Sequence, residues 1–78
     1  MIIDTKFNVG DSVYLAEIYE IYWADKTPYV IDGIVVHSNG KKTVVVYNIK
    51  RDQLHFEVSE KFLFATYEEC VRWCNEHN

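Results

Sequence analysis

The chain of 78 residues has one proline, three glycines, two cysteines and no long run of apolar residues. Its longest strictly apolar runs, such as Val44-Val45-Val46-Tyr47, are far too short for a transmembrane helix. The opening Met1-Ile2-Ile3-Asp4 lacks a basic flank and a following apolar stretch, so we expect no secretory signal. Eight basic against twelve acidic residues give a net charge of −4, which argues against a protein that coats phosphate backbones. These absences predict a cytoplasmic protein that does not enter a membrane.

Apolar residues make up 49% of the chain and aromatic residues 15%, which is typical of a folded domain rather than a disordered segment. No repeat, linker or low-complexity tract divides the sequence, so residues 1–78 are predicted to form a single domain. A domain of this size builds one small core and has little room for a deep, enclosed active site.

The two cysteines, Cys70 and Cys74, are four residues apart in a predicted helix, a spacing poorly suited to a disulfide. We expect both to be reduced and buried as small apolar side chains. One alternative is a zinc site formed by Cys70, Cys74 and His77, although a second pair of ligands is missing. Another is a nucleophilic Cys70 with His37 or His55 as its base, although two neighbouring glutamates would raise the pKa of that thiol. We expect no metal and no cofactor.

Segment 7–13 has apolar residues around a tight turn, in which Gly10 can adopt a positive φ and Asp11 can accept from nearby backbone. Residues 12–23 are rich in valine, isoleucine, tyrosine and tryptophan, which favours a β-strand. Their alternation is imperfect, so we expect a β-bulge near Ala16 or Glu17. A helix over the same residues is the alternative, because several of their apolar positions also fit a helical period.

The dipeptide Asn39-Gly40 lies between two β-rich runs, residues 29–38 and 41–50, and is a strong hairpin signal. A two-residue type I′ turn there would place Asp32 opposite Tyr47 on the face that packs on the core. That pairing suggests a hydrogen bond from the tyrosine hydroxyl to the carboxylate, because an aspartate on a core face needs a partner.

Gly33 within the first of these runs suggests a β-bulge or a close backbone approach. The other face of the hairpin is rich in valine, and we expect the C-terminal helix to cover it. Left uncovered, the same face would suit pairing with a second copy of the chain. The valines concerned are Val35, Val44 and Val46.

Residues 54–58 alternate apolar and polar side chains, which predicts a further strand. Thr66 and Glu69 form a capping box at the start of a helix over about residues 66–77. Together these patterns predict a mainly β (α+β) domain, with an antiparallel sheet of four to five strands and one C-terminal helix.

The opening Phe7-Asn8-Val9-Gly10-Asp11-Ser12-Val13 and the central hairpin resemble small SH3-like barrels, a group that includes Tudor-type and KOW-type modules. This resemblance covers about half of the chain and implies a small antiparallel barrel over about residues 7–59. The ending Leu63-Phe64-Ala65-Thr66-Tyr67-Glu68-Glu69 is similar to the closing segment of short uncharacterised proteins of Gram-positive bacteria and their phages. That similarity brings no known activity with it.

A cluster of aromatic residues around the first loop predicts a surface for a protein partner, because tyrosine and tryptophan are frequent interface anchors. An aromatic cage for a methylated cation is a narrower version of this prediction. The alternative interpretation is that the rings seal the ends of a small barrel. The residues are Tyr14, Tyr19, Tyr22, Trp23 and Tyr29.

Other functions remain as alternatives. Four basic residues of the hairpin would serve a nucleic-acid-associated module, and a homo-oligomeric structural protein is a third candidate. The chain lacks a glycine-rich phosphate loop, a nucleophile elbow and a paired metal motif, so we expect no enzyme. The sequence therefore predicts a non-catalytic binding module for a protein. Its small size suggests a product of a phage or mobile element that modulates a host protein. The basic residues are Lys41, Lys42, Lys50 and Arg51.

Overall fold

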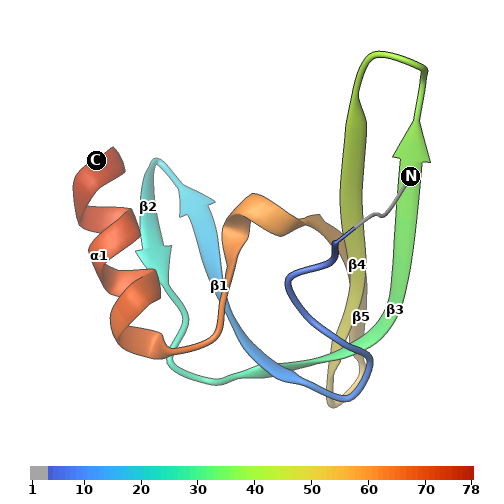
Figure 1. Ribbon diagram of the computed structural model, residues 1–78. Helices are drawn as coiled ribbons and strands as arrows, with labels where there is room; N and C mark the ends of the chain where they lie inside the picture. The colour runs from blue at the N-terminus through green and yellow to red at the C-terminus, as the bar shows by residue number, and fades with distance from the viewer. Residues whose placement is uncertain (1–3) are drawn as a thin grey trace.

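The computed structural model describes residues 4–78 and shows an antiparallel sheet followed by one helix (Figure 1). This confirms the predicted mainly β domain with a C-terminal helix. Residues 1–3, on which the expectation of no secretory signal partly rests, lie outside the described part of the chain. In chain order the elements are β1 (Ser12–Tyr19), β2 (Ile21–Ala24), β3 (Tyr29–Ser38), β4 (Thr43–Arg51), β5 (Leu54–Ser59), the 3₁₀ turn η1 (Glu60–Phe62), β6 (Leu63–Phe64) and α1 (Tyr67–His77).

Within residues 4–78 the sheet has six strands and remains open. Its order is β2-β1-β3-β4-β5, and β6 pairs separately with β1. The predicted closed barrel of four to five strands is therefore wrong: within residues 4–78, β2 and β5 are edges of the sheet that do not pair with each other. The additional strand arises at Glu20, whose φ of 68° turns the chain and divides the single strand predicted over residues 12–23 into β1 and β2.

β1 is covered on both of its faces. Val13 and Leu15 point into one buried cluster, whereas Ala16 and the half-buried Tyr14 belong to a second cluster under α1. Because both faces are covered, apolar residues on both parities are expected, and the imperfect alternation needs no bulge. The pairing of β1 with β2 runs regularly from Ala16 to Tyr19, so the bulge predicted near Ala16 is wrong, and so is the alternative helix.

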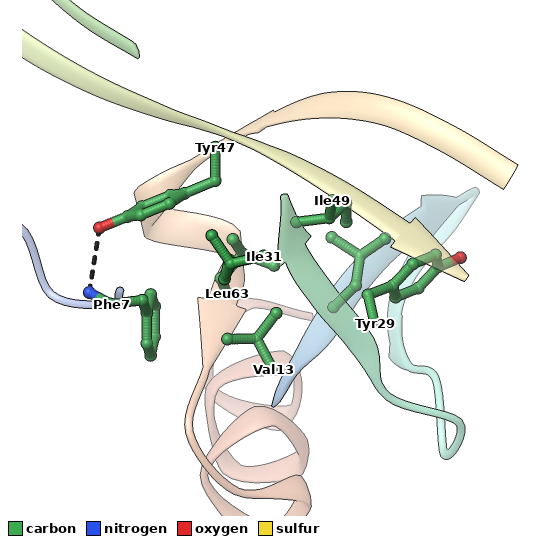
Figure 2. Packing of buried hydrophobic residues seen from close by; sticks show 8 residues of the cluster. Phe7, Val13, Tyr29, Ile31, Tyr47, Ile49 and Leu63 are labelled. Atoms are coloured by element: carbon green, nitrogen blue, oxygen red, sulfur yellow. Dashed lines mark hydrogen bonds between the residues drawn. The ribbon is translucent and has the colours of Figure 1, made fainter. Parts of the chain in front are cut away.

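The first buried cluster, here called the main core, lies between β1, β3, β4 and the N-terminal segment (Figure 2). Its polar groups are satisfied from distant parts of the chain. The Tyr47 hydroxyl accepts a hydrogen bond from the Phe7 N–H (3.1 Å) and donates one to the Glu60 carboxylate. The residues of the main core are Phe7, Val13, Leu15, Tyr29, Ile31, Tyr47, Ile49 and Leu63.

The second buried cluster, here called the helix-side cluster, lies where α1 packs against β1, β2 and β6. The helix begins as predicted: the Thr66 hydroxyl caps it by accepting a hydrogen bond from the Glu69 N–H (3.2 Å). The buried members are Ala16, Phe64, Cys70 and Cys74, and the half-buried residues packed on them are Tyr14, Tyr22, Ala24 and Trp73.

Two glycines act as the sequence predicts. Gly10 adopts a φ of 95° in the turn before β1, and the Asp11 carboxylate accepts a hydrogen bond from the Asn8 N–H (2.8 Å). At Gly33 the register between β3 and β4 shifts, which confirms the predicted bulge.

The bulge at Gly33 has a consequence that the sequence prediction missed. One extra residue reverses which side chains face the core, so Ile31 is buried and Asp32 is exposed. The residue opposite Tyr47 is Ile34, and the predicted pairing of Asp32 with Tyr47 is wrong. Asp32 instead lies within 3.4 Å of the Lys50 ammonium, on the outer face of the sheet.

The β3–β4 turn is centred on Gly40-Lys41 rather than on Asn39-Gly40. The Asn39 N–H donates to the Lys42 carbonyl (3.2 Å), and the Lys42 N–H donates to the Asn39 side-chain oxygen (3.0 Å). Within this turn only Gly40 has a positive φ, 87°, as in a type II′ turn. The predicted type I′ turn is therefore wrong, and the true register differs from it by two residues.

The valine-rich outer face of β3 and β4 is not covered by the helix. Val35, Val44 and Val46 are half-buried, and α1 packs at the other end of the molecule, against β1, β2 and β6 (Figure 1). The expectation that the helix covers these valines is wrong, because the chain places β6 and α1 beside β1.

Candidate functional site

Tyr29 belongs to the core and not to a binding surface. Its side chain is 1% exposed, the Phe56 ring packs against it edge-on at 5.4 Å, and the Arg51 guanidinium lies 4.1 Å from its ring centre. The prediction that Tyr29 contacts a partner is therefore corrected: Tyr29 is the first residue of β3, and its side chain belongs to the main core.

Tyr14 and Tyr22 are half-buried beneath the helix. Tyr14 packs on Tyr67 with 6.0 Å between ring centres, and Tyr22 contacts Trp73 edge-on at 4.9 Å and stacks on Phe62 at 6.3 Å. For these two tyrosines the alternative interpretation, in which rings close the core, describes the structure better. The rings around Tyr22 pack on one another and so do not form an open cage for a cation.

Tyr19 and Trp23 are the two predicted contact residues that stay exposed, at 79% and 44% of their surface. In the β1–β2 hairpin, Tyr19 lies opposite Ile21, and Glu17 lies opposite Trp23. Cross-strand partners point to the same side of a sheet, so these four residues share one surface, here called the hairpin face. Ile21, 60% exposed, was missed in the sequence because the turn at Glu20 was not foreseen.

Ionisable groups surround the base of the hairpin face. The Arg51 guanidinium donates to the Asp25 carboxylate and to the Thr27 carbonyl, both at 2.8 Å. Burial and a hydrogen bond with Asp25 raise the pKa of Glu17. Burial acts to raise the pKa of Asp25, but the Thr27 N–H and Arg51 outweigh it and lower that pKa. Arg51 therefore ties Asp25 and the Thr27 carbonyl together, which fixes the loop after β2.

The four basic residues predicted for nucleic acid do not form one patch. Lys41 and Lys42 are exposed at the turn, whereas Lys50 and Arg51 lie at the opposite end of β4. Lys50 pairs with Asp32 (3.4 Å), and Arg51 is held by Asp25. Of the four, only Lys41 and Lys42 lie together, at the exposed turn.

The cysteines are buried in the helix-side cluster, and both are free thiols. Burial raises the pKa of Cys70 to about 12, so a thiolate nucleophile at this position is not accessible near neutral pH. His77, the third zinc ligand considered, stacks on Trp73 at 4.0 Å, and its Nδ1 lies 2.8 Å from the Trp73 carbonyl. No group of three histidine, cysteine or carboxylate side chains within residues 4–78 is arranged to hold a metal ion.

A groove runs between the edge strand β2 and α1. Its volume is about 300 Å³, and the helix contributes mainly Tyr67, Val71, Cys74 and Asn75 to its lining. At one end the Asn78 side chain bonds the β2 backbone: its carbonyl accepts from the Tyr22 N–H and its amide donates to the Tyr22 carbonyl, both at 2.7 Å. The sequence carries no signal for this contact, because it joins residues 56 positions apart.

No protein-family model matches the chain, and searches of curated proteins and of solved structures find no match either. The helix of residues 67–77 is too short to cross a bilayer, and residues 4–78 contain no other candidate span. The hairpin face and the groove are therefore interpreted from their own geometry.

Proposed function

We propose that this protein is a non-catalytic binding module that docks on a partner protein through its β1–β2 hairpin. The observation that supports the proposal is the exposure of Tyr19, Ile21 and Trp23 on one surface. At about 200 Å² for each large side chain, the three leave roughly 400 Å² of apolar surface in water, a size often linked to binding.

The surroundings of the hairpin face favour a protein over a nucleic acid. Glu17 shares the face, Glu20 forms the turn, and the chain carries a net charge of −4, so phosphate groups would be repelled. A standard interface buries about 800 Å² on each partner, so the apolar residues would form its centre and the glutamates its rim. A partner with basic residues around an apolar patch fits this arrangement.

The proposal includes three expectations from the sequence. These are the relationship of segment 7–13 to SH3-like modules, a place in the cytoplasm, and an origin in a phage or mobile element whose product modulates a host protein. The open sheet does not conflict with a binding role, because an open sheet presents edges as well as faces.

Site-specific cross-linking tests this proposal. A photoreactive benzoylphenylalanine replaces Tyr19 in one variant and Glu68, on the exposed side of α1, in a control variant. We expect a discrete cross-linked protein in native lysate from the Tyr19 position only, and its loss when Trp23→Ala is added to a chain that remains folded by circular dichroism. The same adducts from both positions, or none from Tyr19, would reject the hairpin face as the docking surface.

Self-association through the valine face is a second candidate. Its supporting observation is that Val35, Val44 and Val46 are half-buried on the outer sheet face without cover from α1. Light scattering after size-exclusion chromatography would give twice the monomer mass, and Val44→Thr would return it to the monomer. A monomer mass at high concentration rejects this candidate and leaves the hairpin proposal intact.

A further inference from the structure

The backbone of β2 presents hydrogen-bonding groups away from the sheet. The Asp25 N–H donates to the Leu15 carbonyl (3.2 Å), just beyond the Ala16–Ala24 pair. In an antiparallel ladder this pattern marks Ala16–Ala24 as a non-hydrogen-bonded pair, and residues two positions away repeat it. The N–H and C=O of Tyr22 and Ala24 therefore point outward, along the free edge of β2.

The outward groups of Tyr22 already bind an amide. The Asn78 carboxamide accepts from the Tyr22 N–H and donates to the Tyr22 carbonyl, both at 2.7 Å. A carboxamide carries one carbonyl and an N–H donor in the arrangement of a peptide group. The edge of β2 thus binds, within this chain, the chemical group that a neighbouring strand would supply.

The groove lies along β2. All four residues of the strand, 21–24, line it, and its volume is about 300 Å³. A strand added to β2 would lie about 4.8 Å from it. The far wall of the groove is α1, which contributes the apolar side chains of Tyr67, Val71 and Cys74. Side chains of an added strand would alternate between this wall and solvent.

We infer that the groove between β2 and α1 receives an extended segment of the partner protein, which adds to β2 as a further strand and replaces the Asn78 amide. The inference rests on the proposed function, because it specifies the kind of partner that the β1–β2 hairpin receives. Main-chain hydrogen bonds to Tyr22 and Ala24 provide affinity, and apolar side chains facing Val71 provide selectivity. Asn78 competes for the site, so it limits binding by segments that offer no favourable side chains.

The competition predicts how the Asn78→Ala protein behaves. In Asn78→Ala the Tyr22 N–H and carbonyl are free, so an incoming strand does not first have to break the two hydrogen bonds to the Asn78 carboxamide. Two neutral hydrogen bonds correspond to about a tenfold change in the affinity for that strand. The matched control is Asn75→Ala, since Asn75 lines the same groove but makes no bond to Tyr22 among the hydrogen bonds of residues 4–78.

A displayed library of random nonapeptides is the probe, panned against the unmodified protein, Asn78→Ala and Asn75→Ala. We expect enriched peptides with alternating apolar residues, which bind Asn78→Ala about tenfold more tightly than the other two proteins by fluorescence anisotropy. Backbone N-methylation of the peptide residue that faces Tyr22 should abolish binding, whereas methylation one residue away should leave it within twofold. Protection of the Tyr22 amide from hydrogen exchange should fall in Asn78→Ala and return when the peptide binds.

Failure of this inference is distinguishable from failure of the proposed function. If no peptide is enriched, or if N-methylation has no effect at any position, strand addition is rejected. A discrete cross-link from position 19 in the same circumstances shows that the hairpin binds its partner in another way. Enriched peptides that leave the Tyr22 amide unprotected also reject the groove as their site.

Discussion

The main core and the helix-side cluster differ in the size and type of their buried side chains. The main core contains eight buried residues, mostly branched aliphatic and aromatic, and its buried hydroxyl at Tyr47 is satisfied by Phe7 and Glu60. In the described part of the chain the helix-side cluster has four buried residues, of which three are small: one alanine and two cysteines. The rest of its contact is made by half-buried residues on β1, β2 and α1, mostly aromatic.

This difference assigns separate roles to the two regions. Large, fully buried side chains fix the positions of β3, β4 and the first half of β1, whereas small residues and partly exposed rings hold α1 and β2. Binding surfaces are commonly found in regions of lower local stability that a rigid scaffold supports. The groove belongs to the helix-side region. The hairpin face lies on the opposite side of the same two strands, β1 and β2, away from α1.

The sharpest test of the contrast compares one truncation in each cluster. Ile49 is fully buried in the main core, and Ile49→Ala is expected to lower the free energy of unfolding by about 3–4 kcal/mol, because it leaves a cavity. Cys74→Ala, in the helix-side cluster, removes a single sulfur atom and is expected to lower it by about 1 kcal/mol. Urea denaturation followed by fluorescence measures both, and equal losses would contradict the contrast.

The next effect concerns the hydroxyl inside the main core. Tyr47→Phe leaves the buried Phe7 N–H without an acceptor, so we expect a loss of about 2 kcal/mol in the free energy of unfolding. Tyr19→Phe is the matched control, because it removes a hydroxyl from a side chain that is 79% exposed, and it should change stability by less than about 0.5 kcal/mol. A stable Tyr47→Phe protein would show that the hydroxyl does not anchor the N-terminal segment.

A smaller effect, of opposite sign, is expected at the hairpin turn. Glu20 has a φ of 68°, a conformation that glycine adopts without strain, so Glu20→Gly should stabilise the fold by about 0.5–1 kcal/mol. Glu57→Gly provides the control: Glu57 is an exposed residue within β5, where glycine should instead destabilise the strand. The measurement is the urea midpoint, and a shift in the same direction for both variants would contradict this account.

The smallest expected effect is electrostatic. Burial comes first among the causes that raise the pKa of Glu17, followed by Asp25, so Asp25→Asn should lower that pKa without returning it to its ordinary value. Carbon-detected NMR titration of the carboxyl groups measures the change. Asp32→Asn is the control, because Asp32 pairs with Lys50 and His55 on the outer sheet face and should leave Glu17 unaffected.

The sign of the related change in stability follows from the same shifts. The pKa of Asp25 is lowered in the folded protein, so its contribution is present above its ordinary pKa and is lost as the pH falls through the folded value. The pKa of Glu17 is raised, so its contribution is present at low pH and declines as the pH rises through the folded value. Asp25→Asn should therefore lose less stability than the unmodified protein on acidification below about pH 4.

Patterns with a local physical cause could be predicted from the sequence. The turn at Gly10, the bulge at Gly33 and the Thr66 cap each depend on a residue whose backbone or side-chain preference acts over a few positions. The fold class followed from the same kind of signal. Tyr19 and Trp23 were predicted as contact residues because tyrosine and tryptophan are frequent interface anchors, and both are exposed.

What could not be predicted depended on contacts between distant parts of the chain. The sequence does not show that α1 lies on β1, so the second covered face of that strand was interpreted as a bulge. The turn position was off by one residue because Gly40 fits the first central position of one turn type as well as the second of another. The Asn78–Tyr22 contact joins two segments that no local pattern relates.

The pairing of β6 with β1 places Leu63 in one cluster and the next residue, Phe64, in the other, just as Leu15 and Ala16 divide on β1. The paired segments β1 and β6 therefore separate the two clusters and present apolar side chains to both. If either cluster unfolded, the apolar side chains on its side of β1 and β6 would be exposed to water, and the other cluster would lose stability as well. Although different residues form the two clusters, the molecule should therefore unfold in a single cooperative transition, with equal calorimetric and van't Hoff enthalpies.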